Sequence, residues 1–330
     1  MSKRIAFSGG FDMPIFLVPG LAAMASVAWA APAVELAPDV YFIAGEFVEG
    51  RQPDGNSVLI RAPEGWIVVD TGRHREHTRK LLDLTGDTGK PLEAVINTHW
   101  HLDHIGGNVL IRQRIPDVRI YASSALEDAM TGFLADYARQ LEEAIDSTGD
   151  EEAKGRLRTE LGLIETGEQL APHEVLHRSG PRTIAGRKLS LVLEKRAVTA
   201  GDIWVLDPAT GILAAGDLVT LPVPFFDTAC PERWKAALQS LSDARFTLLV
   251  PGHGEPMNRE AFEQYRTAFD NLLACAASEH TDSECVDAWS RDADDLLSPA
   301  DVPRISGMLD YYMKARLRAD AASIPYSCDG

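Results

Sequence analysis

Apolar residues come in short runs over the first third of the chain, and polar turns containing Gly, Pro or Asp separate the runs. Runs of this length between turn residues are typical of buried strands. Five such strands are predicted, at 40–45, 56–61, 66–70, 92–97 and 118–122. Between the third and the fourth, a mixed polar and apolar stretch at 74–86 stops at Gly86 and predicts a helix.

The spacing of the apolar residues changes in the middle of the chain. Apolar residues recur every three or four positions over 124–145, which predicts one amphipathic helix, and a charged helix is predicted over 151–165. Residues 171–180 are polar and are expected to form a loop. Further strands are predicted at 182–186, 188–194, 202–207, 211–217 and 246–252, and further helices at 231–242 and 259–275. This order predicts an α/β fold with two sheets packed face to face and helices outside.

The N-terminal segment has the features of a targeting signal. A positively charged start precedes an apolar run at 13–30, which ends in the small residues of Ala28-Trp29-Ala30 and predicts a signal peptide over 1–30. The alternative is an uncleaved membrane anchor, for which the run is short. We therefore expect a periplasmic or secreted protein, with no stable membrane insertion after cleavage of the signal.

Four cysteines lie in the last third of the chain, and their even number in an exported protein predicts two disulfides. The cysteines are Cys230, Cys275, Cys285 and Cys328, and three pairings are open. We expect the bridges to hold a helical, cysteine-containing C-terminal extension over 276–330, after a main domain over 31–275.

Composition narrows the choice of partners. The chain has 330 residues with 45% hydrophobic and 25% charged residues, the balance of a folded globular protein, and a formal net charge of −17. Such an acidic chain repels phosphate backbones and anionic lipid, so we expect no nucleic-acid partner and favour a small-molecule substrate. Nothing in the composition selects an oligomeric state.

One short segment concentrates histidines. Residues 98–104, Thr-His-Trp-His-Leu-Asp-His, directly follow the predicted strand 92–97 and place three of the nine histidines beside an aspartate. Imidazoles and a carboxylate that converge on one point suit zinc or a similar divalent ion. The alternative, a surface cluster without a ligand role, fits this spacing poorly because such a pattern rarely arises by chance.

The spacing H-x-H-x-D-H resembles the signature of the metallo-β-lactamase superfamily. Three further segments match the motifs of this family in the right order: Ile-Val-Val-Asp-Thr-Gly at 67–72, Ala-Ala-Gly-Asp-Leu-Val at 214–219 and Pro-Gly-His-Gly at 251–254. The resemblance covers about residues 38–270 and implies a four-layer αββα sandwich with a metal site at one edge of the sheets. It implies six metal ligands, namely His99, His101, Asp103, His104, Asp217 and His253. Asp70 would act behind them by orienting the ligands.

The pattern breaks at one position. The family usually has a further histidine in the segment that corresponds to 198–202, and here Val198 stands in its place. The site formed by His99 and His101 therefore lacks its third histidine, so that one zinc ion, two ions of unequal affinity, or another substituting ligand all remain open. The histidines outside the motifs are expected at the surface: His74, His77, His173, His177 and His280.

The resemblance implies an exported metal-dependent hydrolase in which metal-bound hydroxide attacks an ester, thioester, lactone or lactam carbonyl. Asp103 would be both a ligand and the catalytic residue that orients the nucleophile. Phe225 and Phe226 are candidate substrate-binding residues, with core packing as the equal alternative. The rival function is a non-catalytic periplasmic metal-binding or scaffold protein that lost its activity together with the third histidine.

Overall fold

The structure of the protein is a computed structural model that describes residues 33–48, 50–319 and 328. The predicted signal peptide, 1–30, lies outside the described residues. Within the described ranges, no helix combines the length and the apolar composition that crossing a bilayer requires.

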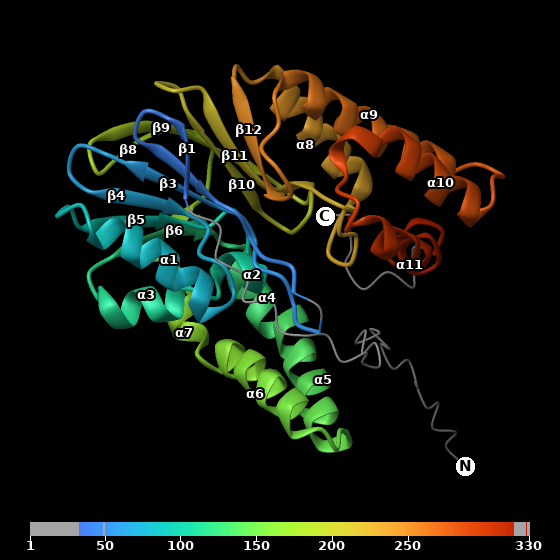
Figure 1. The fold of residues 1–330 in the computed structure, drawn as a ribbon, viewed down its shortest axis with the longest axis horizontal. Coiled ribbons are helices and arrows are strands. Elements are labelled where there is room, and N and C mark those ends of the chain that lie inside the picture. The colour runs from blue at the N-terminus through green and yellow to red at the C-terminus, as the bar shows by residue number, and fades with distance from the viewer. Residues whose placement is uncertain (1–32, 49, 320–327, 329–330) are drawn as a thin grey trace, which may run out of the picture.

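Two β-sheets form the centre of the molecule (Figure 1). The first sheet has the strand order β1 (Val34–Ala37), β2 (Val40–Ile43), β3 (Ser57–Arg61), β4 (Trp66–Val69), β5 (Leu92–Ile96), β6 (Arg119–Ser123) and β7 (Glu174–Leu176). Strands β1 to β4 pair antiparallel and β4 to β7 pair parallel. The second sheet has the order β12 (Leu248–His253), β11 (Ile212–Thr220), β10 (Asp202–Asp207), β9 (Arg187–Glu194) and β8 (Gly180–Ile184). In this sheet, only the β11–β12 pair is parallel.

The sheets and helices stack in four layers. Helices α1 (Arg75–Gly86) and α3 (Asn108–Arg114) flank the first sheet, and α8 (Pro231–Asp243) and α9 (Arg259–Ala276) flank the second (Figure 1). Apolar side chains from both sheets, including Ile67 and Val205, form a core between them. Separate cores lie between each sheet and its helices. The predicted αββα sandwich is therefore confirmed.

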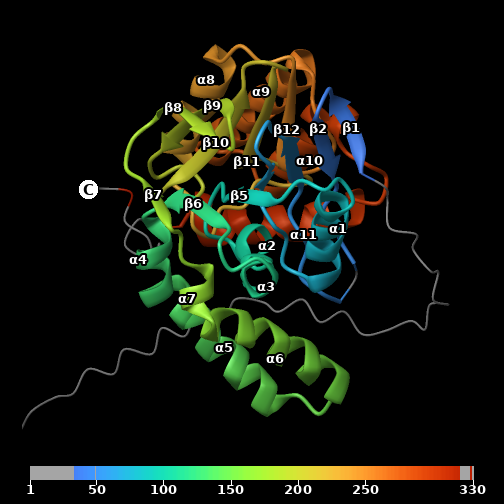
Figure 2. The same ribbon diagram turned by 90° about the vertical axis from the view of Figure 1, so that its left-hand side faces the viewer.

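A helical hairpin projects from the sandwich (Figure 2). It is formed by α4 (Ala125–Thr131), α5 (Phe133–Ser147), α6 (Glu151–Glu165) and α7 (Gly167–Leu170). The prediction of one continuous helix over 124–145 is wrong, because the chain leaves helical geometry at Gly132, with φ −110° and ψ −105°. The predicted polar loop at 171–180 is also corrected, since β7 within it pairs parallel with β6 and buries Leu176.

The last helices pack on the second sheet's helical layer. They are α10 (Asp282–Asp292), the 3-10 helix η1 (Asp294–Leu296), α11 (Val302–Tyr312) and the π-helical turn η2 (Met313–Leu317). Trp289 and Leu309 from these helices share one hydrophobic core with Trp234 of α8 and Phe269 of α9. The helical content predicted for 276–330 is thus present, and in the described part it is continuous with the main core.

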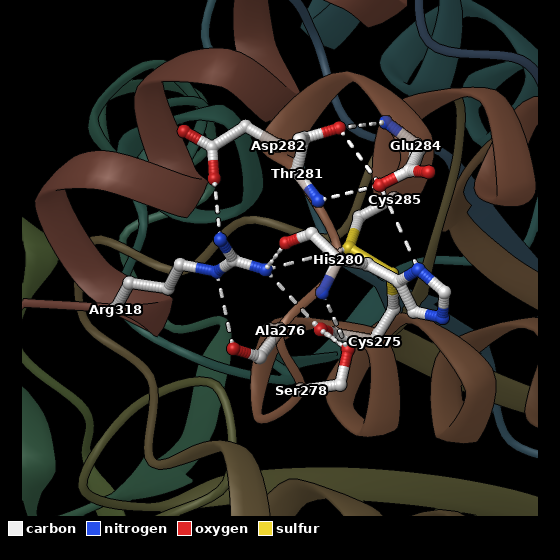
Figure 3. Close-up of a disulfide and its surroundings, with 9 residues drawn as sticks. All are labelled: Cys275, Ala276, Ser278, His280, Thr281, Asp282, Glu284, Cys285 and Arg318. Atoms are coloured by element: carbon white, nitrogen blue, oxygen red, sulfur yellow. Dashed lines mark hydrogen bonds and ion pairs between the residues drawn. A yellow bond between two sulfur atoms is a disulfide. The ribbon is translucent and has the colours of Figure 1, made fainter.

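Two disulfides connect this C-terminal part to the rest of the chain. Cys230 is bonded to Cys328. Cys275 is bonded to Cys285, as Figure 3 shows. The first bridge joins the start of α8 to the far C-terminus, and the second closes the turn between α9 and α10. Two bridges were predicted, and folding selects one of the three pairings that the sequence allows.

His77 lies inside the molecule, which corrects the prediction of a surface residue. Its side chain is 2% exposed, and its Nε2 lies 2.8 Å from Ser57 Oγ. The helix α1 turns this position toward the first sheet. Burial lowers the pKa of His77 to about 4, because it penalises the charged imidazolium.

We expect His77→Gln to make the protein less sensitive to acid. With a pKa of about 4 in the folded state and 6.5 in the unfolded state, the unfolded chain takes up the proton first as the pH falls. The stability that depends on neutral His77 is therefore complete above pH 6.5 and is lost on acidification toward pH 4. The loss amounts to between about 3 and 4 kcal/mol at most, at roughly 1.4 kcal/mol per pKa unit.

Urea unfolding of both proteins across this pH window measures the effect. Gln keeps a hydrogen-bonding partner for Ser57 but does not titrate. His280→Gln, at an exposed position, is the matched control and should leave the pH profile unchanged. A constant difference in unfolding free energy between wild type and His77→Gln at every pH would contradict the expectation.

Candidate metal centre

The predicted ligands meet at one edge of the sandwich, where parallel strands end. His99 and His101 follow β5, Asp103 and His104 lie in the short helix α2 (Leu102–Ile105), Asp217 lies in β11 and His253 ends β12. The carboxyl ends of parallel strands are where open α/β sheets commonly place their ligands. The fold therefore brings together all six residues that the motifs indicated.

Asp70 and Thr98 orient two of the histidines. Asp70 directly follows β4, adopts a positive φ of 61° and accepts hydrogen bonds from Thr98 N at 2.8 Å and Thr98 Oγ1 at 2.7 Å. The same carboxylate lies 2.8 Å from His104 Nδ1, so this nitrogen carries the proton that it donates. Thr98 Oγ1 already donates its proton in the hydrogen bond to Asp70 and therefore accepts a hydrogen bond from His99 Nδ1, at 2.9 Å. In the neutral form of each histidine, the unprotonated nitrogen is therefore Nε2.

His101 is oriented by a different residue, Thr228. The Thr228 hydroxyl donates to the carbonyl oxygen of Val198 at 2.8 Å and lies 2.9 Å from His101 Nε2. Since the hydroxyl proton is already used, Thr228 accepts from Nε2–H and the lone pair of His101 is on Nδ1. Sequence reasoning missed Thr228, and nothing in the chain around it distinguishes it.

Asp217 stands between two groups of candidate ligands. Its Oδ2 lies 3.5 Å from His99 Nε2 and 3.8 Å from His101 Nδ1. Its Oδ1 lies 3.1 Å from His104 Nε2 and 3.6 Å from His253 Nε2. The carboxylate thus offers one oxygen toward each of the two groups of histidines.

The second group is completed by Asp103 and His253. Asp103 Oδ2 lies 3.0 Å from His253 Nε2 and 3.7 Å from His104 Nε2. Backbone approaches closely from the other side, because a Cβ on Gly252 would lie 2.0 Å from Asp217 Oδ1. Glycine at this position of the β12 motif therefore makes room for the carboxylate.

The free ligand atoms test whether the site fits a metal. His99 Nε2, His104 Nε2 and Asp217 Oδ1 are buried and have no hydrogen-bond partner within the described residues. Buried polar atoms are rarely left in this state unless something else binds them. His99, His101 and Asp217 offer ligand atoms within 4.8 Å of one another, as do Asp103, His104 and His253. A set of imidazole nitrogens and carboxylate oxygens fits zinc.

The electrostatics of the cluster favour ionised carboxylates. Burial alone would raise the pKa of Asp217, but the charges of His104, His253 and His99 outweigh it and hold that pKa well below 3.8. Burial also opposes charge on His104, yet Asp217, Asp70 and Asp103 raise its pKa well above 6.5. The carboxylates are thus ready to bind a cation, and zinc would have to displace a proton from His104.

Arg73 is a further residue of the site that sequence reasoning missed. Its Nη2 lies 3.4 Å from Asp103 Oδ1, on the side of the carboxylate away from His253. Arg73 also pairs with Glu160 of α6, and Tyr137 of α5 donates to Glu160 at 3.2 Å. A buried ion pair connects the projecting hairpin to a candidate ligand in this way. Its position directly after the motif 67–72 is the one signal that could have identified Arg73.

Val198 takes no part in ligation. Its side chain is buried in the core formed with α8 and α9, and its N–H donates to Asp202 Oδ2 at 3.1 Å. Asp202 also accepts from Thr199 N and Thr199 Oγ1, and burial raises its pKa to about 7. The buried carboxylate of Asp202 thus fixes the backbone at Val198 and Thr199. Thr228, and not residue 198, contacts His101.

The other predicted side chains lie in different surroundings. The ring of Phe225 is half-buried and meets His101 edge-on, with centroids 5.0 Å apart. Phe226 is 1% exposed and packs against Trp234 and Phe269, which selects core packing over the substrate-binding role that was the equal alternative for it. Of the histidines outside the motifs, His173, His177 and His280 are exposed, whereas His74 is half-buried.

His74 belongs to a buried network behind the candidate ligands. Its Nδ1 lies 2.9 Å from Asp54 Oδ2 and its backbone N–H donates to Asp54 Oδ1 at 2.8 Å. Gly55 next to Asp54 donates to the carbonyl oxygen of Asp103 at 2.9 Å. The loop before β3 therefore braces the helix that carries Asp103.

A sequence model described as the metallo-beta-lactamase superfamily matches residues 50–273. Among curated proteins, a linear primary-alkylsulfatase from Pseudomonas sp. is 30% identical over 230 residues, which are 62% of this chain and 43% of the relative. A hydroxyacylglutathione hydrolase from Thermosynechococcus vestitus is 42% identical over 57 residues, which are 17% of this chain and 21% of the relative. The chain thus spans less than half the length of either relative.

A solved structure supports the same fold. The metallo-beta-lactamase from Pontibacter korlensis superimposes with a TM-score of 0.54 at 21% identity. The superposition covers 72% of this chain and 98% of that protein. At this level of identity, the likeness concerns the arrangement of the backbone.

We expect Asp70→Asn to weaken zinc binding about 10- to 100-fold, the usual cost of losing a residue that orients a ligand. An amide places an N–H where His104 Nδ1–H now donates, so His104 would shift its proton to Nε2 and lose its free lone pair. Competition with a chromophoric chelator measures the affinity.

Asp39→Asn is the matched control for Asp70→Asn. Asp39 also has a positive φ, 68°, but pairs with Arg61 at the surface. The control separates the backbone preference of Asn from the loss of the carboxylate. Equal zinc affinities in wild type and Asp70→Asn would show that Asp70 does not orient the site.

Proposed function

Because the chain belongs to the metallo-β-lactamase superfamily, we propose that it is a metal-dependent hydrolase with His99, His101, Asp103, His104, Asp217 and His253 as its ligands. The observation that carries this proposal is the set of buried, unpartnered atoms on His99, His104 and Asp217, all directed at one region. We propose that the residues would hold two zinc ions, one in the group of His99, His101 and Asp217 and one in the group of Asp103, His104 and His253.

Zinc in such a site supplies Lewis acidity and lowers the pKa of water to about 7, so that a nucleophile is available at neutral pH. The chain's own residues supply the rest. Asp103 Oδ2 faces His253, and Arg73 contacts Asp103 Oδ1. Burial by itself would raise the pKa of Asp103, but the stronger effects of His104, His253 and Arg73 hold that pKa well below 3.8. Asp103 therefore stays ionised and can orient a water molecule by accepting its proton in a hydrogen bond.

The substrate is proposed to approach from the side of Phe225. The half-buried ring of Phe225 lies against His101, and its partial exposure suits contact with an apolar part of a substrate. We propose hydrolysis of an ester, thioester, lactone or lactam carbonyl. A sulfate ester is the second candidate, because the alkylsulfatase relative is 30% identical over 230 residues.

The non-catalytic alternative starts from Val198. Loss of the third histidine would fit a protein that keeps metal but no longer turns over substrate. Orientation of His99, His101 and His104 supports metal binding under either proposal. We favour an enzyme because a site that had lost its function would be expected to lose ligands in several places, and Asp103, His104, Asp217 and His253 all remain together.

Export is proposed from the disulfides and the N-terminal sequence. Both bridges close between described cysteines, and disulfides persist chiefly in oxidising compartments. We propose that residues 1–30 are a signal peptide and that the mature protein acts in the periplasm or outside the cell.

The first test is zinc content. We expect roughly two equivalents per chain in the wild type, because each group of three ligands forms one site. His99→Ala should lower the content to about one equivalent. Elemental analysis after dialysis measures both. One equivalent in both proteins would mean that the group around His253 binds alone, and none would exclude a metallohydrolase.

The second test is turnover by Asp103→Ala. We expect kcat/KM to fall about 100-fold or more, because the variant loses a ligand and the residue that orients the nucleophile. The substrate panel contains a carboxylic ester, a thioester, a lactone, a lactam and a primary alkyl sulfate. Asp117→Ala, at an exposed aspartate, is the control.

Zinc-loaded wild type that hydrolyses nothing in this panel would favour the non-catalytic alternative. Hydrolysis by wild type that Asp103→Ala leaves unchanged would show that the activity arises elsewhere. Addition of a chelator and reconstitution with zinc should abolish and restore the wild-type activity.

A further inference from the structure

We propose that the C-terminal turn η2 is a positioning element for the metal centre, which acts on His101 through Asp227 and Thr228. This inference rests on the proposed metal site and adds to it a part of the chain that the family match does not reach. The match ends at residue 273, whereas η2 covers Met313–Leu317.

The inner end of this connection is the pair of Thr228 and His101. Thr228 is buried, and its hydroxyl has one available direction because it donates to the Val198 carbonyl. His101 Nε2–H is therefore held at 2.9 Å, and Nδ1 faces Asp217. A shift of Thr228 would release the ring and allow the proton to move to Nδ1.

The next link is Asp227, the neighbour of Thr228 in the chain. Its carboxylate is 5% exposed and accepts a hydrogen bond from Tyr311 Oη at 3.0 Å. Arg316 of η2 pairs with the same oxygen, Oδ1, at 2.7 Å. A carboxylate buried this deeply is unstable without a cation beside it. The ion pair with Arg316 therefore fixes the position of the segment around Asp227.

A second contact runs beside the first. Tyr312, the last residue of α11, meets Phe225 at 6.1 Å and Phe226 at 5.6 Å between ring centroids. Phe225 in turn lies edge-on against His101. The same C-terminal segment thus supports both residues that contact the His101 ring from this side, one through charge and one through packing.

The turn η2 is itself fixed at its outer end. Arg318 donates to the carbonyl oxygens of Ala276 at 3.1 Å and His280, and pairs with Asp282 at 3.1 Å (Figure 3). These groups lie in the α9–α10 turn that the Cys275–Cys285 disulfide closes. The second bridge, Cys230–Cys328, joins the chain two residues after Thr228 to the C-terminus.

The absence of a histidine at position 198 explains why the site would need this support from the C-terminal segment. A third histidine would fix by direct coordination the metal ion held by His99 and His101, and Val198 cannot do so. With His99, His101 and Asp217 alone, the geometry of that ion depends more strongly on how well each imidazole is held. The C-terminal segment supplies that rigidity from outside the ligand set.

The experiment measures the tautomer of His101 in the metal-free protein by long-range ¹H–¹⁵N NMR. The His101 signals are assigned from their loss in His101→Gln. We expect wild type to show one tautomer with the proton on Nε2. Thr228→Val and Arg316→Gln should show a mixture of both tautomers. In each variant, the zinc affinity of the group that contains His101 should fall about 10-fold or more.

Arg304→Gln is the matched control. Arg304 lies on α11, stacks on Phe47 and pairs with Asp301, so it belongs to the same C-terminal segment but makes no hydrogen bond or ion pair with Asp227 or Thr228 within the described residues. It should keep both the wild-type tautomer and the wild-type zinc affinity. The double variant Asp227→Asn/Arg316→Gln removes the ion pair without leaving a buried charge, and replaces Arg316→Gln if that protein does not fold.

The outcomes separate this inference from the proposed function. If Arg316→Gln and the double variant both keep the Nε2–H tautomer and the zinc affinity, η2 does not position His101 and the inference is wrong. If wild type binds no zinc, the proposed function fails, while the tautomer measurement still decides the role of η2. A loss in Arg304→Gln equal to that in Arg316→Gln would reduce the effect to general stability and would also overturn the inference.

Discussion

A buried carboxylate among imidazoles is the constraint around which this molecule is arranged. Asp217 is 4% exposed, lies within a central strand and has an oxygen with no hydrogen-bond partner among the described residues. Such a group is stable only if positive charge is brought to it. His99, His104 and His253 do so in part, and the geometry leaves space for cations between them.

Orientation of the ligands is a separate task, and it falls to residues that touch no metal. Asp70 binds Thr98 and His104 from the end of β4, so one carboxylate sets the direction of two imidazoles. Thr228 performs the same task for His101 from the opposite side of the site. The ligand lone pairs thus converge because strands of both sheets and the loop after β11 meet at one edge.

Two helical additions reach this edge from different directions (Figure 1). The projecting hairpin contacts Asp103 through Glu160 and Arg73, and the C-terminal helices contact the region of His101 through Asp227 and Tyr312. Both contacts bury charge or aromatic surface next to a candidate ligand. Parts of the chain that carry no motif therefore influence the site by packing and by ion pairs.

The sequence by itself determined most of the strands and helices along the chain, because short apolar runs are local signals, and the resemblance of its motifs to a known family implied the four layers and the candidate ligands. It could not show that Gly132 breaks a helix with a continuous apolar pattern, or that His77 and Phe226 point inward, because burial depends on what packs against an element. The disulfide pairing and the roles of Arg73 and Thr228 were decided only by the tertiary structure. Most of these contacts, such as Cys230–Cys328 and His101–Thr228, join residues far apart in the chain, and no local pattern encodes a distance that arises when the sheets and helices pack together.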